Sequence, residues 1–343
     1  MDNQEQTEYK DGRTTDGIYQ KIAKLVKEWL EVHKGERFDL DTVCKQLDIQ
    51  ERDNRKYVAI ELNRKVEQGI IEKVSISRPP IYTIINKDIK NIPWQAASSK
   101  DELFIRFPIS HYDDTYFSFG EYIVTRPADI WVVAGVSNKG KSTLVRNLLW
   151  DNMDLIPCRM MVSEYAPGRF KSVVSRMTWA NPLKADGTPK FELIERHSDW
   201  RYAIVPDALN IIDWIGLGDN FWEIRTVIEG IQDSLRGGMA VIVLQKNEGK
   251  TLGEGGAFSE QRASVYLNID SGVLTVRKIK ECKNNMYFDG KSYGFDVIDG
   301  GAGLADIREV KKCPACSGSG VSYKKGEGKD SCDKCRGIGW ISK

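Results

Sequence analysis

The spacing of apolar residues along the first quarter of the chain predicts a small helical domain that ends in a hairpin. Over 18–33, apolar side chains recur at helical spacing, at Ile18, Ile22, Leu25, Val26, Trp29 and Leu30. Asp41 is placed to cap the second predicted helix, and Gly69 to end the third. In chain order, the predicted elements are a helix over 18–33, an extended piece at 37–40, helices over 42–49 and 51–68, and strands over 70–77 and 80–86.

A different pattern occupies residues 101–310, where continuous apolar runs alternate with stretches of helical periodicity. This alternation is typical of a mostly parallel sheet flanked by helices, so the predicted fold class is α/β. The run at 130–136 has no polar side chain, as expected for a strand buried on both faces. A helical pattern follows directly over 143–153.

Composition adds limits to this picture. The 343 residues include 50 Lys+Arg and 49 Asp+Glu, so total charge neither indicates nor excludes a nucleic-acid partner. The polar start lacks the apolar segment of a signal peptide, and no apolar run is long enough to span a bilayer. We therefore expect a soluble, cytoplasmic protein with no membrane partner. The predicted domains are a disordered leader (1–16), a helix-and-hairpin domain (17–88), a linker (89–100), an α/β core (101–310) and a cysteine-rich module (311–343).

The order of elements in 17–88 resembles a winged helix-turn-helix domain. Its third helix is rich in basic side chains that can reach phosphates and base edges, and Arg78 lies at the expected wing tip. The alternative is a solvated helix face or a protein contact, because winged helices also bind proteins. The candidate nucleic-acid residues are Arg52, Arg55, Lys56, Arg64, Lys65 and Arg78.

Residues 135–142 fit G-x-x-x-x-G-K-[ST], between a predicted strand and a predicted helix. In that context the backbone N–H groups of the loop and of the helix N-terminus bind phosphates. Lys141 is expected to contact the β- and γ-phosphates of ATP or GTP, and Ser142 to ligate Mg²⁺. The expected nucleotide-binding residues are Gly135, Ser137, Asn138, Lys139, Gly140, Lys141, Ser142 and Thr143.

Two carboxylates stand at the ends of other apolar strands. Asp213 follows the run 209–212 and is expected to reach Mg²⁺ through water, although a strand-end Asp can also cap the next turn. Glu164 follows the apolar run 160–162.

These motifs, in this order, resemble RecA-like P-loop ATPases and in particular the hexameric replicative (DnaB-like) helicases. The matching residues are Ser163-Glu164-Tyr165, Arg176-Met177 and Ile212-Asp213-Trp214-Ile215. The resemblance implies that Glu164 is the general base and that Gln245 senses the γ-phosphate. It also implies that the glycine-rich loop 248–263, with Lys250 and Arg262, faces a central channel and contacts DNA. The alternatives are a Gln that satisfies local backbone groups and a loop that only connects elements.

The same helicases carry a Lys-x-Arg pair that enters the neighbouring subunit's ATP site. Here the spacing is matched by Lys278 and Lys280, with Arg277 just before them. Lys is a poorer bidentate partner for phosphate than Arg, so the choice among the three stays open. The resemblance covers about 100–300, and the winged-helix-like block replaces the helicases' primase-docking domain.

The tail contains two copies of C-x-x-C-x-G-x-G, at 313–320 and 332–339. Cys313, Cys316, Cys332 and Cys335 are spaced to hold one tetrahedral Zn²⁺. A redox role would require a strand-to-helix context that neither copy has. The repeat resembles half of the cysteine-rich domain of DnaJ chaperones. The lysines around it can bind nucleic acid or dock a protein, and their charge favours nucleic acid.

The function expected from these observations is an ATP-dependent motor on single-stranded DNA. Its cofactors are ATP, Mg²⁺ and Zn²⁺, and its partners are further copies in a ring, as a hexamer, and replication proteins. Its architecture suits a phage- or plasmid-type replication helicase. The alternatives are a recombination or repair ATPase that forms filaments on DNA, and an ATP-gated DNA-binding regulatory switch.

Overall fold

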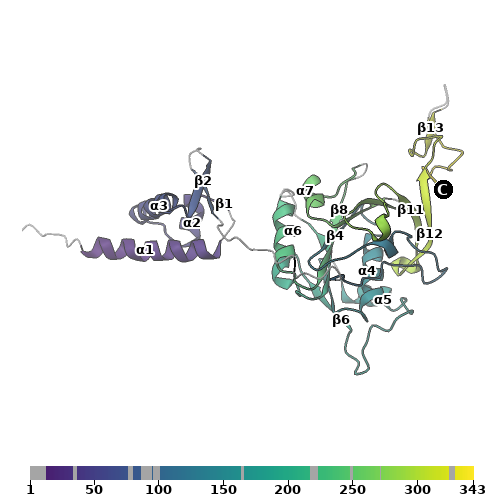
Figure 1. Cartoon of the computed structure of the whole chain (residues 1–343), viewed down its shortest axis with the longest axis horizontal. Helices are drawn as coiled ribbons and strands as arrows, with labels where there is room; N and C mark the ends of the chain where they lie inside the picture. The colour runs from purple at the N-terminus through teal and green to yellow at the C-terminus, as the bar shows by residue number, and fades with distance from the viewer. Residues whose placement is uncertain are drawn as a thin grey trace, which may run out of the picture. The chain divides into compact units, whose positions relative to one another are not determined.

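The computed structural model describes residues 13–33, 37–75, 80–85, 95, 101–163, 166–216, 223–247, 250–270, 272–323 and 329–343. The chain forms two compact units, Met1–Ala96 and Ala97–Lys343 (Figure 1). Among the described residues, no helix has the length and apolar character needed to cross a membrane.

The first unit packs three helices against a small antiparallel sheet of order β1-β3-β2. Its core is formed by side chains from every helix, with Val26, Val43, Val58 and Leu62 completely buried. The elements are α1 (Arg13–Val32), β1 (Arg37–Phe38), α2 (Leu40–Gln46), α3 (Arg52–Glu67), β2 (Ile71–Ser75) and β3 (Ile81–Ile84).

The prediction that Asp41 caps the second helix is wrong. The N-cap of α2 is Asp39, whose carboxylate accepts hydrogen bonds from the Thr42 N–H at 2.8 Å and the Thr42 hydroxyl at 2.7 Å. Asp39 has the extended backbone that an N-cap needs, whereas Asp41 already lies in the first helical turn. Both positions carry Asp, and only the backbone conformation distinguishes them.

The second unit is built on a ten-stranded sheet of order β15-β12-β11-β10-β9-β4-β8-β7-β5-β6. The six strands from β9 to β6 are mutually parallel, and those from β9 to β15 pair antiparallel. The strands are β4 (Ile130–Gly135), β5 (Cys158–Val162), β6 (Phe191–Glu195), β7 (Leu209–Ile215), β8 (Met239–Gln245), β9 (Val265–Asp270), β10 (Val273–Ile279), β11 (Ser292–Ile298), β12 (Gly303–Lys312) and β15 (Trp340–Ser342).

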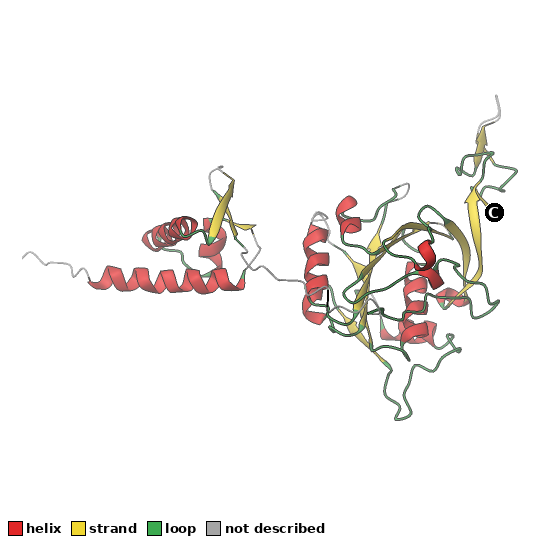
Figure 2. Cartoon of the chain, viewed as in Figure 1, coloured by secondary structure: helices red, strands yellow, loops and turns green. Residues whose placement is uncertain are grey.

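Helices cover both faces of this sheet (Figure 2). Along β4 the side chains alternate, with Trp131 and Val133 in the core that includes α4 and α5, and Ile130 and Val132 in the core that includes α6. The predicted α/β class, a mostly parallel sheet flanked by helices, is confirmed. The helices are α4 (Lys141–Asn152), α5 (Pro167–Val174), α6 (Ile224–Asp233) and α7 (Ala257–Gln261), with short 3-10 turns η1 (Gly120–Tyr122), η2 (Trp200–Ala203), η4 (Lys283–Asn285) and η5 (Asp299–Gly301).

The cysteine-rich module is inserted between two paired strands of the same sheet. β12 leads into it and β15 returns from it to pair with β12, Lys312 lying opposite Trp340. The module also contains the hairpin of β13 (Val321–Tyr323) and β14 (Lys329–Ser331). The 310/311 boundary expected from composition falls within β12.

Candidate functional site

The parallel strands bring three of the predicted site residues to one edge of the sheet. Gly135 at the end of β4 lies in register with Gln245 at the end of β8. Asp213, in β7, pairs with Val162 at the end of β5. Because parallel strands end at a common edge, residues far apart in sequence meet where β4 passes into α4.

The loop between β4 and α4 has the backbone that a phosphate-binding turn requires. Gly140, the N-cap of α4, has φ 97°, a left-handed conformation that favours glycine. Gly135 is required for packing instead, because a Cβ there would lie 2.5 Å from the carbonyl oxygen of Ile269. Asn138 to Thr143 line the cavity at this edge, of about 410 Å³, while Ser137 is exposed. The first backbone N–H groups of α4 therefore lie at the wall of this cavity.

Lys141 is almost completely buried at the start of α4. Its Nζ donates hydrogen bonds to the Val136 carbonyl at 2.8 Å and to Gln245 Oε1 at 3.3 Å. Burial lowers the pKa of Lys141 and the charge of Lys246 lowers it further, whereas Asp213 opposes the shift. The Lys141 ammonium group and the Gln245 amide are therefore in direct contact.

Ser142 and Asp213 form the second pair at the site. The Ser142 hydroxyl donates to Asp213 Oδ1 at 3.2 Å, and Asp213 is 3% exposed. A hydroxyl and a carboxylate side by side are hard oxygen donors, which suit Mg²⁺ held together with nucleotide phosphates. The donor set thus fits the metal that the phosphate-binding loop implies.

Several residues that sequence reasoning missed also line the cavity. Arg169 and Val173 come from α5, and Val297 and Gly300 come from β11 and η5. Arg146, on α4, donates to the Gly301 carbonyl at 3.0 Å and ties the helix to η5. Arg146 could have been found from its position one turn after Ser142. Val297 and Gly300, about 150 positions further along the chain, reach this cavity only because of the fold.

Glu164, the predicted general base, lies outside the described residues. The chain up to Ser163 is described, and the Ser163 N–H donates to the Asp213 carbonyl at 3.4 Å. The described part of this segment thus runs beside β7 at the edge where Asp213 lies.

The three candidates for a trans-acting finger lie at the end of β10. Arg277 Nε donates to Glu260 Oε1 at 3.1 Å, and Lys278 Nζ donates to the Glu260 carbonyl at 3.1 Å. Lys280 is tied through its backbone N–H to the Ser264 carbonyl. Of the candidate channel residues, Arg262 pairs with Glu229 at 3.0 Å. Lys250 is exposed and lines a cavity other than the nucleotide cavity.

The basic residues of the first unit fall into two groups. Lys65 and Arg64 lie 3.0 Å and 3.9 Å from Glu61, a buried carboxylate that also accepts a 2.8 Å hydrogen bond from the Tyr19 hydroxyl. These two cations therefore pair within α3 with the carboxylate that Tyr19 of α1 contacts. The others lie at the start of α3, where Arg55 pairs with Asp41, Lys56 pairs with Asp53 at 2.7 Å, and Arg52 is exposed, while Arg78 is outside the described residues.

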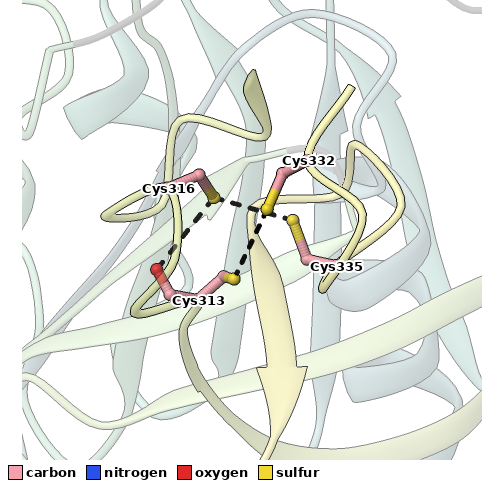
Figure 3. A group of neighbouring side chains, drawn as sticks. All are labelled: Cys313, Cys316, Cys332 and Cys335. Carbon is pink, nitrogen blue, oxygen red and sulfur yellow. Dashed lines mark hydrogen bonds between the residues drawn. The ribbon is translucent and has the colours of Figure 1, made fainter. Parts of the chain in front are cut away.

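The four tail cysteines converge as predicted (Figure 3). Their sulfur atoms all lie within 4.8 Å of one another, with Cys313–Cys332 at 3.9 Å and Cys316–Cys335 at 3.6 Å. Tetrahedral zinc with Zn–S bonds of about 2.3 Å separates its sulfurs by about 3.8 Å. The N–H of Gly320 donates to Cys316 Sγ at 3.3 Å, and that of Gly339 to Cys335 Sγ at 3.2 Å. The cluster therefore fits one Zn²⁺, with N–H groups placed to stabilise the thiolates.

Of the other cysteines, Cys44 and Cys158 are buried and Cys282 is half-buried. Burial raises the pKa of the Cys158 thiol to about 12. A thiol of this kind is unreactive.

No protein-family model matches the sequence, and no curated protein matches it. Among solved structures, one that is similar is a crystal structure of a KaiC-like protein from the hyperthermophilic archaeon Pyrococcus horikoshii OT3. The likeness has 14% identity and a TM-score of 0.42, and covers 60% of this chain and 99% of that one. The second unit itself has a mostly parallel sheet and a strand–loop–helix arrangement at the phosphate-binding motif.

Proposed function

We propose that the protein is an ATP-dependent motor on single-stranded DNA, of the ring-forming helicase type found in phage and plasmid replication systems. One observation carries the proposal: Lys141, Ser142, Asp213 and Gln245 come from three elements and meet in two direct hydrogen bonds at one edge of the sheet. A phosphate-binding lysine, a metal-binding pair and a sensor amide at one site are the parts that nucleotide hydrolysis requires.

Each residue has a defined task in this proposal. The N–H groups at the start of α4 hold the phosphate oxygens, and Lys141 neutralises the charge that develops on the γ-phosphate. Ser142 and Asp213 would hold Mg²⁺, which would neutralise charge on the phosphates. Glu164 accepts the proton of the attacking water.

Gln245 links hydrolysis to the partner. The Lys141 Nζ that it contacts is the group that will bind the γ-phosphate, so loss of that phosphate changes the hydrogen bonding of Gln245. Gln245 is followed by Lys246, whose backbone N–H donates to the Gly135 carbonyl at 3.0 Å, and then by the segment that leads to Lys250. A change in hydrogen bonding at the γ-phosphate is therefore passed from Gln245 to the glycine-rich loop 248–263 through only a few residues.

The test is the rate of ATP hydrolysis with and without single-stranded DNA. Strong stimulation, lost in Lys141→Ala and in Glu164→Gln, is the expected result. Removing one charge-stabilising donor typically lowers the rate by about 10²–10³-fold. Hydrolysis that is indifferent to DNA would contradict the motor and favour the ATP-gated switch.

Unwinding of a forked duplex then separates a helicase from a filament-forming ATPase, because only the helicase opens the fork. The proposal includes assembly as a hexamer with ATP at subunit interfaces. It also includes nucleic-acid binding by the winged-helix-like first unit, a zinc ion at the four cysteines, and replication proteins as partners.

A further inference from the structure

A second and larger cavity, of about 890 Å³, lies between the nucleotide-binding core and the cysteine-rich module. One wall comes from Val136 and from the segment after β8, and the other from β12 and β15. We call it the lysine groove after the cations that line it: Lys246, Lys250, Lys291, Lys311, Lys312 and Lys343.

The groove has an excess of positive charge. Its six lysines are opposed by three carboxylates, Asp270, Asp289 and Glu309. Two of these are already paired, Asp270 with Lys246 at 2.6 Å and Glu309 with Lys343 at 2.7 Å. The cations in excess are therefore those of the loop after β8, of the turn before β11 and of the end of β12.

An aromatic side chain lies among these cations. Trp340 lines the groove from β15, is half-buried, and pairs in register with Lys312 of β12. Lysines beside an aromatic ring are the combination that binds a single strand of nucleic acid, because the cations meet phosphates while a base stacks on the ring. An acidic protein surface would pair with the lysines but would have no base to stack on the Trp340 ring.

We propose that the lysine groove holds a single strand of nucleic acid, with Lys311 and Lys312 on the phosphates and Trp340 against a base. This inference rests on the proposed function and names the surface through which it acts. The groove shares two segments with the nucleotide site, since the carbonyl of Val136 accepts a hydrogen bond from Lys141, and Lys246 follows Gln245. A strand bound there lies directly against the parts that respond to the γ-phosphate.

The experiment measures binding of a fluorescent oligo-dT to the full zinc-loaded chain by anisotropy at several salt concentrations. The double variant Lys311→Ala/Lys312→Ala removes two phosphate contacts, so the slope of log K against log[salt] should become shallower by about 1.4. The control Lys171→Ala/Lys184→Ala removes the same charge from exposed positions that do not line the groove. It should keep the slope of the unchanged chain.

Trp340→Ala should weaken binding by about 5- to 150-fold, the loss of one stacked base, and Trp340→Phe should restore part of it. Zinc content and β-sheet circular dichroism are measured for each variant. A rescue by Phe that leaves both unchanged separates stacking from a structural role. Oligo-U of the same length shows whether the strand is DNA or RNA, and either result supports the groove.

The groove and the motor fail in different ways. If the Lys311/Lys312 variant keeps the unchanged chain's salt slope while hydrolysis is still stimulated by DNA, the groove is wrong and the motor stands. If the Lys311/Lys312 variant binds the oligonucleotide more weakly, but DNA does not change the rate of hydrolysis by the unchanged chain, the groove stands and the motor is wrong. Displacement of the oligonucleotide by polyglutamate, with Trp340→Ala without effect, would identify an acidic polypeptide as the ligand and overturn the proposal.

Discussion

At Gly140, backbone conformation and packing both oppose a side chain. Its φ is 97°, and a Cβ built there would lie 3.1 Å from Phe295 and from Val297. We expect Gly140→Ala to displace the start of α4 and to weaken ATP binding by at least about tenfold, or 1.4 kcal/mol. Isothermal titration calorimetry with ATP and Mg²⁺ measures this loss.

Gly187 provides the matched control for this prediction. It has φ 82°, but a Cβ there meets no atom within 4 Å. Gly187→Ala therefore carries only the left-handed backbone cost, about 1–2 kcal/mol in the free energy of unfolding, and should leave ATP binding unchanged. Equal ATP affinities for the two variants would show that the loop tolerates a side chain at Gly140.

At the scale of elements, Asp113 ties the segment before η1 to β12. Its Oδ2 accepts a 2.7 Å hydrogen bond from the Asp306 N–H, and Oδ1 accepts one from the Thr115 hydroxyl at 2.6 Å. The Ser110 and Thr115 hydroxyls, together with this N–H, hold the pKa of Asp113 well below its usual range. Because the folded state lowers this pKa, the carboxylate stabilises the fold above about pH 4, and the contribution is lost as the pH falls through the folded value.

Asp113→Asn should therefore lower the unfolding temperature of the second unit at pH 7, and the difference from the unchanged chain should narrow toward pH 3. Thermal unfolding followed by circular dichroism at both pH values measures it. Asp186→Asn is the control, because Asp186 accepts the same local bonds from Thr188 within an exposed turn. An Asp113 effect that is equal at both pH values would show that ionisation plays no part.

The four-cysteine cluster lies next to a larger element, the pairing of β12 with β15. β15 is three residues long and is held at its start by the turn that carries Cys335. Removing zinc with a chelator should speed hydrogen exchange at 310–312 and 340–342, while β4 and β8 in the sheet centre stay protected. Cys282→Ser should not change this response, because Cys282 is outside the cluster. Exchange in β15 that is insensitive to chelation would show that pairing alone holds it.

Elements with a strong local signal were predictable from sequence. The strand before Gly135, the loop to Ser142 and the paired C-x-x-C turns each carry their own chemistry in consecutive residues, and the fold class followed from their order. The nucleotide cavity's far wall did not follow, because Val297 and Gly300 reach it only through the antiparallel strands added beyond β9. The lysine groove was equally hidden, since its cations come from four separate segments.

At the scale of the whole molecule, the proposed ring of copies would place a neighbouring chain beside each nucleotide site. A ring of identical chains uses heterologous contacts, in which one face of a chain binds a different face of its neighbour. Each nucleotide site in such a ring would therefore face a surface of the neighbouring chain. Within one chain, Arg277 and Lys278 contact Glu260, and neither lines the nucleotide cavity. A finger from the end of β10 must therefore act, if it acts at all, on a second copy.

Mixing two inactive variants tests this directly. Lys141→Ala chains lack the phosphate lysine but keep the finger, whereas Arg277→Ala chains keep the lysine but lack the finger. In a 1:1 mixture that assembles at random, about a quarter of the interfaces combine an intact lysine with an intact finger, so hydrolysis should recover toward a quarter of the unchanged chain's rate. Lys278→Ala and Lys280→Ala are mixed in the same way, and the variant that is rescued identifies the finger. If none of the three single variants reduces hydrolysis, or if none that does is rescued, the finger does not act between subunits at this strand.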